Sequence, residues 1–184
     1  MRPDRVGGGD GAVTARVLGW VLLLAWLSWS FAFQARLAAA SAAGPYVPEI
    51  GLVLSIAVLS RLHEREAPVL ALVLAIARQP YSPEPAVALL AGSLGLCLLG
   101  LAMRSVVELT GPLWRSVAAG ALVACFDLWL AVVHASRPSP SPVPLAIGVG
   151  SLVAVAGSSA ALALFAGPAL AHLPGLSPLR SRRW

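Results

Sequence analysis

The chain has 184 residues, of which 58% are hydrophobic and only 11% are charged, and its mean hydropathy is +0.82. A soluble domain carries about a quarter charged residues, so this composition excludes an ordinary soluble fold and predicts an all-α polytopic membrane protein. All 13 basic residues are arginine, which excludes a GK[ST] phosphate loop and a lysine Schiff base. The arginines flank apolar runs, a pattern that indicates membrane topology and no nucleic-acid partner.

The first apolar run lies between Arg16 and Arg36, which enclose 19 uncharged residues and predict the first membrane helix. Residues 1–15 before it are expected to form a flexible cytoplasmic tail. An alternative is a cleaved signal peptide, because the run is followed by "AAASAAG", which contains small-residue cleavage patterns. Cleavage would place the mature start near Ala42 or Gly44 and would remove the first helix.

Two shorter apolar runs follow, at 50–60 and 67–77, and each has 11 residues. A helix of that length rises only about 16 Å, whereas the hydrocarbon core of a bilayer is about 30 Å thick. The runs therefore predict either two short spans extended by their flanks or a hairpin that does not fully cross. We favour two short spans, because removing either one would put the later arginines on the wrong side of the membrane.

The turn between these runs, "LSRLHERE", gathers Arg61, His63, Glu64, Arg65 and Glu66. A zinc site on helices usually takes a second histidine four positions away, and none lies nearby. We interpret the segment as a solvated cytoplasmic turn with local ion pairs. A contact with a partner protein is the functional alternative.

Three longer runs, at 86–103, 116–133 and 145–166, complete a predicted six-helix membrane domain at 16–167. A cytoplasmic tail that contains proline and arginine is expected at 168–184. With the N-terminus in the cytoplasm, ten arginines lie inside and three outside, which predicts a bacterial inner-membrane protein with both termini in the cytoplasm. The ten are Arg2, Arg5, Arg16, Arg61, Arg65, Arg104, Arg115, Arg180, Arg182 and Arg183, and the three are Arg36, Arg78 and Arg137.

Asp127 is an isolated carboxylate in the apolar run at 116–133. A charge at that depth costs several kcal/mol unless it is protonated, paired or hydrated. Its helical face carries mostly small residues, including Gly120, Ala124 and Ala131, so the side chain is expected to point into the bundle. The position of Asp127 predicts either a polar site in the core of the bundle or a single interhelical hydrogen bond that fixes the packing of the helices.

Two further groups of residues are candidates for contacts between helices or with a partner. Small residues at helical spacing predict close packing, mostly inside the protein and otherwise against a partner's membrane helix. These helix-packing candidates are Gly95, Gly100, Gly120, Gly150, Ala154 and Ser158. The partner-contact candidates in the cytoplasmic turns are Arg61, Glu64, Arg65, Arg104, Glu108 and Arg115.

The stretch "VPEIGLVLSIAVLSRLHEREAPVLALVLAIARQPYSPEP" and the following "AVALLAGSLGLCLLGLAMRS" resemble the MreD family of rod shape-determining membrane proteins. Family members tend to open the second span after a proline, here Pro48, and to end the fourth span with arginine, here Arg104. They often carry Gly-Leu-x-x-Asp at the end of the third span, where this chain has "AIARQP". The resemblance covers about residues 45–133 and implies a fold similar to the substrate-binding subunits of energy-coupling-factor vitamin transporters.

The resemblance implies a non-enzymatic scaffold of the cell-elongation and peptidoglycan-synthesis machinery. Its partner would be an MreC-like membrane protein and, through it, the peptidoglycan synthase pair and the actin-like filament. The alternative is the substrate-binding subunit of a vitamin-type transporter, with pocket candidates Trp29, Tyr46, Tyr81, Asp127 and Trp129. An intramembrane enzyme built on Asp127 and His134 would lack a second catalytic carboxylate or nucleophile, so we expect no enzymatic activity, cofactor or metal.

Overall fold

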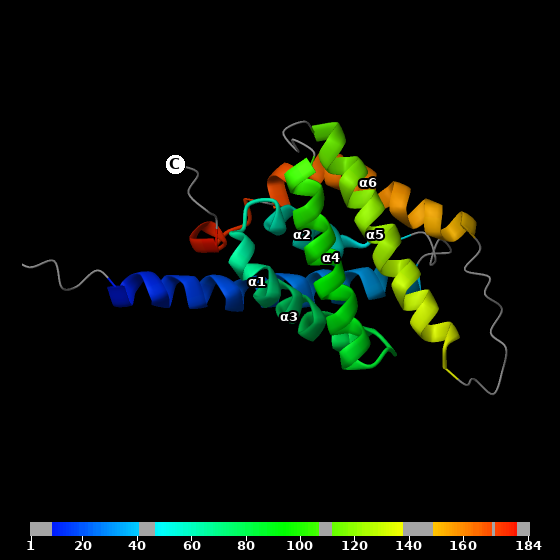
Figure 1. Cartoon of the computed structure of the whole chain (residues 1–184), viewed down its shortest axis with the longest axis horizontal. Helices are drawn as coiled ribbons and strands as arrows, with labels where there is room; N and C mark the ends of the chain where they lie inside the picture. Colours follow the sequence, from blue (N-terminus) through cyan, green and yellow to red (C-terminus); the bar gives the residue numbers. More distant parts are fainter. Residues whose placement is uncertain (1–8, 41–46, 107–111, 138–148, 171, 180–184) are drawn as a thin grey trace, which may run out of the picture.

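Six α-helices account for most of the chain (Figure 1). The computed structural model describes residues 9–40, 47–106, 112–137, 149–170 and 172–179, and these contain no strand. The helices are α1 (Gly9–Ala40), α2 (Ile50–Leu59), α3 (Ala67–Arg78), α4 (Ala86–Val106), α5 (Pro112–Ala135) and α6 (Val149–Leu170). Short 3₁₀ turns are η2 (Glu64–Glu66), η3 (Gln79–Tyr81) and η4 (Ser177–Leu179).

Four helices, α1, α4, α5 and α6, are long and apolar enough to cross a bilayer. Their apolar stretches have 20 to 28 residues, and a spanning helix needs about 20. The predicted all-α fold is therefore confirmed, and four of its helices suit a membrane by length and composition. The other two helices have 10 and 12 residues and rise only about 15 and 18 Å, so they are as short as their apolar runs predict.

The short helix α2 lies at the centre of the molecule and contacts each of the other five helices. Seven of its ten residues are buried, and Leu52 and Leu54 have no exposed surface. A helix that is apolar all round must be surrounded by protein or lipid. Because its neighbours cover it, α2 can remain in the membrane interior although it is too short to cross alone.

The turn between α2 and α3 lies at the end of the molecule that carries Arg16, Arg61, Arg104 and Arg115, which we call the arginine-rich end. An ion pair between Arg16 and Glu66 (2.7 Å) ties this turn to α1, and a hydrogen bond from Arg104 to the turn's backbone (2.9 Å) ties it to α4. At the other end of the hairpin, the backbone N–H of Glu49 donates to Ser159 Oγ, halfway along the 22-residue α6. The two short helices therefore end well inside the bundle.

The long helices α5 and α6 pack closely where both carry small residues. A Cβ at Gly120 of α5 would stand 3.0 Å from the carbonyl oxygen of Ala156 and 3.1 Å from the Cβ of Ala160. Close approach of this kind is what small residues at a spacing of four allow. The small residues of α6 that pack against Gly120 of α5 are therefore Ala156 and Ala160. The row predicted from the sequence, Ala154 and Ser158, lies next to them on the same helix.

Both ends of the membrane domain differ from the predicted boundaries. α1 begins at Gly9, inside the expected flexible tail 1–15, although this first turn contains Gly9 and Gly11, and Arg16 further along the helix pairs with Glu66. α6 continues to Leu170, past the expected boundary at 167. Pro168 is tolerated there because it removes only one hydrogen bond, close to the end of the helix.

Residues 172–179, which follow α6 in the expected tail 168–184, are ordered and pack back onto α1. We call this segment the strap. Leu176 and Leu179 are each only 2% exposed, and η4 contacts α1. Gly19 of α1 leaves room for this strap, since a Cβ there would lie 3.1 Å from Leu179 Cγ. The strap turns at Gly175, whose φ of +83° lies in the left-handed region that favours glycine.

Candidate functional site

A buried ion pair joins the inner ends of the two short helices. Arg78, the last residue of α3, donates two hydrogen bonds of 2.9 and 3.2 Å to the two carboxylate oxygens of Glu49, the residue before α2. The side chains of Arg78 and Glu49 are only 12% and 11% exposed. Such a bidentate fork is the strongest geometry for this pair, and each buried charge depends on the other for compensation.

Three of the long helices contribute groups to this ion pair. The guanidinium carbon of Arg78 lies 5.5 Å from the ring centroid of Phe31 in α1 and 4.8 Å from that of Phe126 in α5, within the range of cation–π attraction. Ser159 of α6 accepts the backbone N–H of Glu49 at 3.0 Å. The cluster of Glu49, Arg78, Phe31, Phe126 and Ser159, which we call the central ion-pair cluster, therefore holds the α2–α3 hairpin to α1, α5 and α6.

Asp127 lies beside the central ion-pair cluster and is not alone in the membrane, as its sequence context suggests. It follows Phe126 in α5, is half-buried, and interacts electrostatically with both Glu49 and Arg78. Its carboxylate makes no hydrogen bond within the described residues, whereas Glu49 accepts two from Arg78. Glu49 is therefore the main partner of the guanidinium, and Asp127 is a second carboxylate next to a pair that is already neutral.

Sequence reasoning misses this ion pair. It places Arg78 in an outside loop and gives Glu49 no role, because each charge stands just beyond an apolar run, where a loop is expected. The feature of the sequence that could have predicted this ion pair is the hairpin of two short helices. Two helices of nearly equal length joined by a short turn bring their far ends together, and here those ends carry opposite charges.

Neutralising the two carboxylates should have unequal effects. Glu49→Gln leaves the Arg78 guanidinium without its charged partner, and we expect it to lower the free energy of unfolding by about 3 kcal/mol. Asp127→Asn removes a charge without a hydrogen-bonded partner, and we expect a change below about 1 kcal/mol. Thermal unfolding of the two purified variants in the same detergent measures the difference. Equal destabilisation would contradict the assignment of Glu49 as the main partner.

A second charged cluster ties the start of α4 to the end of α5. Glu84, only 5% exposed, contacts Nδ1 of His134 through Oε1 (3.2 Å) and forms an ion pair with Arg137. A carboxylate before a helix also interacts favourably with the positive end of its dipole. His134 thus engages Glu84 and lies about 10 Å along the helix axis from Asp127, so the two residues of the enzyme alternative are not brought together.

Three of the six partner-contact candidates lie around one cavity at the arginine-rich end: Arg61, Arg104 and Arg115. Glu64 and Arg65 are exposed in η2 and do not line the cavity, and Glu108 lies outside the described residues. The turn's ion pair runs to Arg16 of α1 and not between the turn's own charges. Within the part of the chain that the structure describes, no group of three or more His, Cys, Asp or Glu side chains suits a metal ion.

An apolar groove of about 280 Å³ lies between α4 and α5. Its lining residues include the buried Gly92, Leu96 and Phe126 and the exposed Gly95 and Cys125. A Cβ placed on Gly95 would have no neighbour within 4 Å. Gly95 is therefore a small helical residue that no other part of the described chain uses for packing.

The other helix-packing candidates lie in different surroundings. Gly100 faces α2, since a Cβ there would stand 2.6 Å from Leu59 Cδ2, and Gly120 faces α6. Gly150 is exposed, and no atom of the described residues lies within 4 Å of a built Cβ. Ala154 and Ser158 are half-buried, and the Ser158 hydroxyl donates to the carbonyl oxygen of Val155 (3.0 Å).

Of the aromatic residues expected to line a transporter pocket, the three that the structure describes lie in different surroundings. Trp29 is 58% exposed and stacks on Phe33 of its own helix, and Tyr81 is exposed in η3. Trp129 donates its indole N–H to the carbonyl oxygen of Ala88 (2.9 Å), which closes one end of the α4–α5 groove. Tyr46 lies outside the described residues.

No protein-family model, curated protein or solved structure matches this chain. Its function is therefore inferred from the geometry of its own residues and from the sequence pattern.

Proposed function

We propose that this chain is a non-enzymatic scaffold of the bacterial inner membrane that binds an MreC-like membrane protein within the cell-elongation machinery. The resemblance to MreD supplies the partner. The observation that carries the proposal is the α4–α5 groove, in which Gly95 contacts nothing within the described chain. A transmembrane helix of the partner would occupy this groove.

The groove has the features that helix association in a membrane needs. Lipid chains are as apolar as leucine, so two membrane helices associate through close packing and not through the hydrophobic effect. Gly95 lets a second backbone approach the wall of α4, whereas Gly92 is already covered by Trp129, and the side chains of Leu96 and Phe126 give the partner helix a fixed surface. A helical glycine costs about 1 kcal/mol relative to alanine, and at Gly95 no contact within the described chain requires it.

The polar groups inside the bundle favour a scaffold over a transporter subunit. A site for a drug-sized ligand usually has a volume of about 300–1,000 Å³ and several convergent polar groups. The α4–α5 groove holds about 280 Å³ with an apolar lining, and the cavity at the arginine-rich end holds about 60 Å³. The interior charges of Glu49 and Arg78 already satisfy each other.

We also propose a six-span topology with both termini in the cytoplasm, in which non-helical flanks complete the spans of α2 and α3. Its support is the positive-inside rule, together with the contacts that gather Arg16, Arg61 and Arg104 at one end. Non-helical backbone at membrane depth is tolerated where protein covers it, and Glu49 is buried among three helices.

Affinity purification from native membranes in a mild detergent tests the proposed function. We expect the tagged chain to bring down an MreC-like membrane protein in a stoichiometric amount. Recovery of the chain alone, with one small molecule bound per chain, would instead identify it as a transporter subunit.

A further inference from the structure

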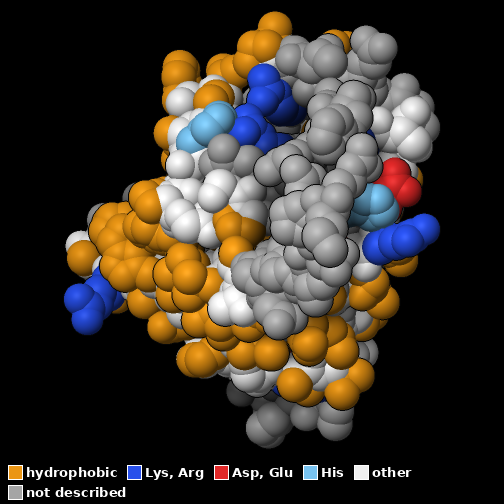
Figure 2. All heavy atoms as spheres, turned by 90° about the vertical axis from the view of Figure 1, so that its left-hand side faces the viewer, with side chains coloured by type: hydrophobic (Ala, Val, Ile, Leu, Met, Phe, Trp, Pro, Cys, Tyr) orange, Lys and Arg blue, Asp and Glu red, His pale blue; other side chains and the backbone are white. Residues whose placement is uncertain are grey.

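A small basic cavity opens at the arginine-rich end, between α2, α4, α5 and α6. Its volume is about 60 Å³, and among the described residues its lining includes Arg61, Arg104 and Arg115 but no carboxylate. Figure 2 shows this side of the molecule, where basic side chains lie recessed near a histidine, with hydrophobic side chains above them. The cavity therefore combines a positive lining with an apolar surround.

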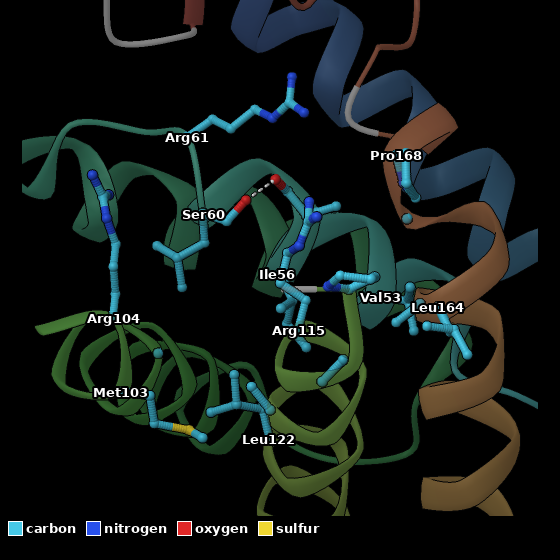
Figure 3. A pocket seen from close by; sticks show the side chains of 18 residues that line it. Val53, Ile56, Ser60, Arg61, Met103, Arg104, Arg115, Leu122, Leu164 and Pro168 are labelled. Atoms are coloured by element: carbon cyan, nitrogen blue, oxygen red, sulfur yellow. Dashed lines mark hydrogen bonds between the residues drawn. The ribbon is translucent and has the colours of Figure 1, made fainter. Parts of the chain in front are cut away.

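Arg115 is the charged group that points into the cavity. In Figure 3 its side chain rises from α5 toward the end of α2, into the space between the helices. Its Nε atom is buried and has no hydrogen-bond partner among the described residues. A buried donor on a cation without a partner is costly, and such atoms are rare in folded proteins. An anion in the cavity would satisfy it.

The other two arginines border the cavity and are already held by the protein. Arg104 donates to the carbonyl oxygen of Leu62 at 2.9 Å, and Arg61 lies 3.2 Å from Nε2 of His172. Figure 3 shows Arg104 rising beside the turn after α2 and Arg61 extending from that turn above the end of the Arg115 side chain. These contacts fix two positive charges at the edge of the cavity, so they raise its potential for an anion without filling it.

We propose that this cavity binds the phosphate of an anionic phospholipid, with Arg115 as the main contact. A volume of about 60 Å³ holds several water molecules, which suits a phosphate group but not a drug-sized molecule. The apolar wall that includes the half-buried Ile56 and Leu164 offers a surface for the acyl chains. Basic pockets between membrane helices on the cytoplasmic side are suited to anionic headgroups. This site is separate from the α4–α5 groove and does not depend on the scaffold proposal.

Lipid retention by charge-matched variants tests the proposal. The delipidated full chain and its variants Arg115→Gln and Arg65→Gln are titrated with phosphatidylglycerol, phosphatidylcholine or inorganic phosphate, and native mass spectrometry counts the bound molecules. Arg65 is the control, because it is exposed at the same end and does not line the cavity. We expect wild type and Arg65→Gln to retain one phosphatidylglycerol. In Arg115→Gln the apparent affinity should fall about tenfold or more, as for loss of a charge-assisted hydrogen bond.

A second variant keeps the charges and fills the space. Gly167 of α6 lines the cavity and has no atom within 4 Å of a built Cβ, so Gly167→Leu should fold and should also weaken phosphatidylglycerol binding about tenfold. If Arg115→Gln does not fold, the phosphatidylglycerol affinity of Gly167→Leu tests the site by itself. Unchanged affinity in Gly167→Leu, or equal losses in Arg115→Gln and Arg65→Gln, would overturn the site. If inorganic phosphate binds in an Arg115-dependent way but phosphatidylglycerol is not retained, the ligand is free phosphate and not a phospholipid.

Discussion

Arg78→Leu is expected to lower the free energy of unfolding by about 3 to 5 kcal/mol. The substitution leaves the Glu49 carboxylate, only 11% exposed, without the cation that donates two hydrogen bonds to it. It also removes the contact that joins the inner ends of α2 and α3. Thermal or denaturant unfolding in a fixed detergent, followed by circular dichroism, measures the loss.

The double variant Glu49→Leu/Arg78→Leu is the control for this effect. Replacing both partners of a buried ion pair by apolar residues is often neutral or stabilising, so we expect the double variant to recover most of the lost stability. Arg65→Leu, which removes an exposed arginine, should change stability by no more than about 0.5 kcal/mol. A double variant as unstable as the sum of the two single ones would contradict the account of Glu49 and Arg78 as mutually compensating charges.

Gly95→Leu is expected to reduce recovery of the MreC-like partner about tenfold or more, which corresponds to at least about 1.4 kcal/mol of binding free energy. The leucine side chain would project into the α4–α5 groove and would keep a partner helix from the close approach that glycine allows. The fold should be unaffected, because no atom lies within 4 Å of the new Cβ. Leucine is also a better helix former than glycine. Quantitative co-purification, with unfolding of the free chain measured in parallel, checks both parts.

Gly157→Leu is the matched control for the groove. Gly157 lies within α6, is exposed and also has no atom within 4 Å of a built Cβ, but it does not line the groove. We expect this variant to recover the partner at the wild-type level. If the two variants lose the partner equally, or if Gly95→Leu keeps it, the α4–α5 groove is not the docking surface.

The sequence was sufficient to predict the helices, because each depends on local composition. The two apolar runs of 11 residues correspond to helices of 10 and 12 residues, joined at the charged turn as expected. The helix ends were harder to place. α1 begins earlier than expected, at Gly9, and its Arg16 pairs with Glu66, which lies 50 positions away in the sequence; the strap after α6 is ordered because Leu179 packs at Gly19.

The candidate sites could be predicted only in part, because they depend on pairings between distant segments. Asp127 is recognisable by its depth in an apolar run, but its neighbours Glu49 and Arg78 stand at the start of α2 and the end of α3. Both look like loop residues, since nothing local shows that their ends of the hairpin stop inside the bundle. Likewise, Arg115 looks like any flanking arginine until α2 and α6 are placed around it.

Cys125 offers the most direct test of the claim that the α4–α5 groove binds a partner helix. It is exposed and lines the groove, whereas Cys97, the other cysteine, is fully buried. A photoreactive thiol reagent can therefore be attached to Cys125 in native membranes, with Cys125→Ala as the unlabelled control. After irradiation, the account predicts a crosslink to an MreC-like membrane protein that disappears in Cys125→Ala. Crosslinks to lipid alone, or only to another copy of this chain, would contradict it.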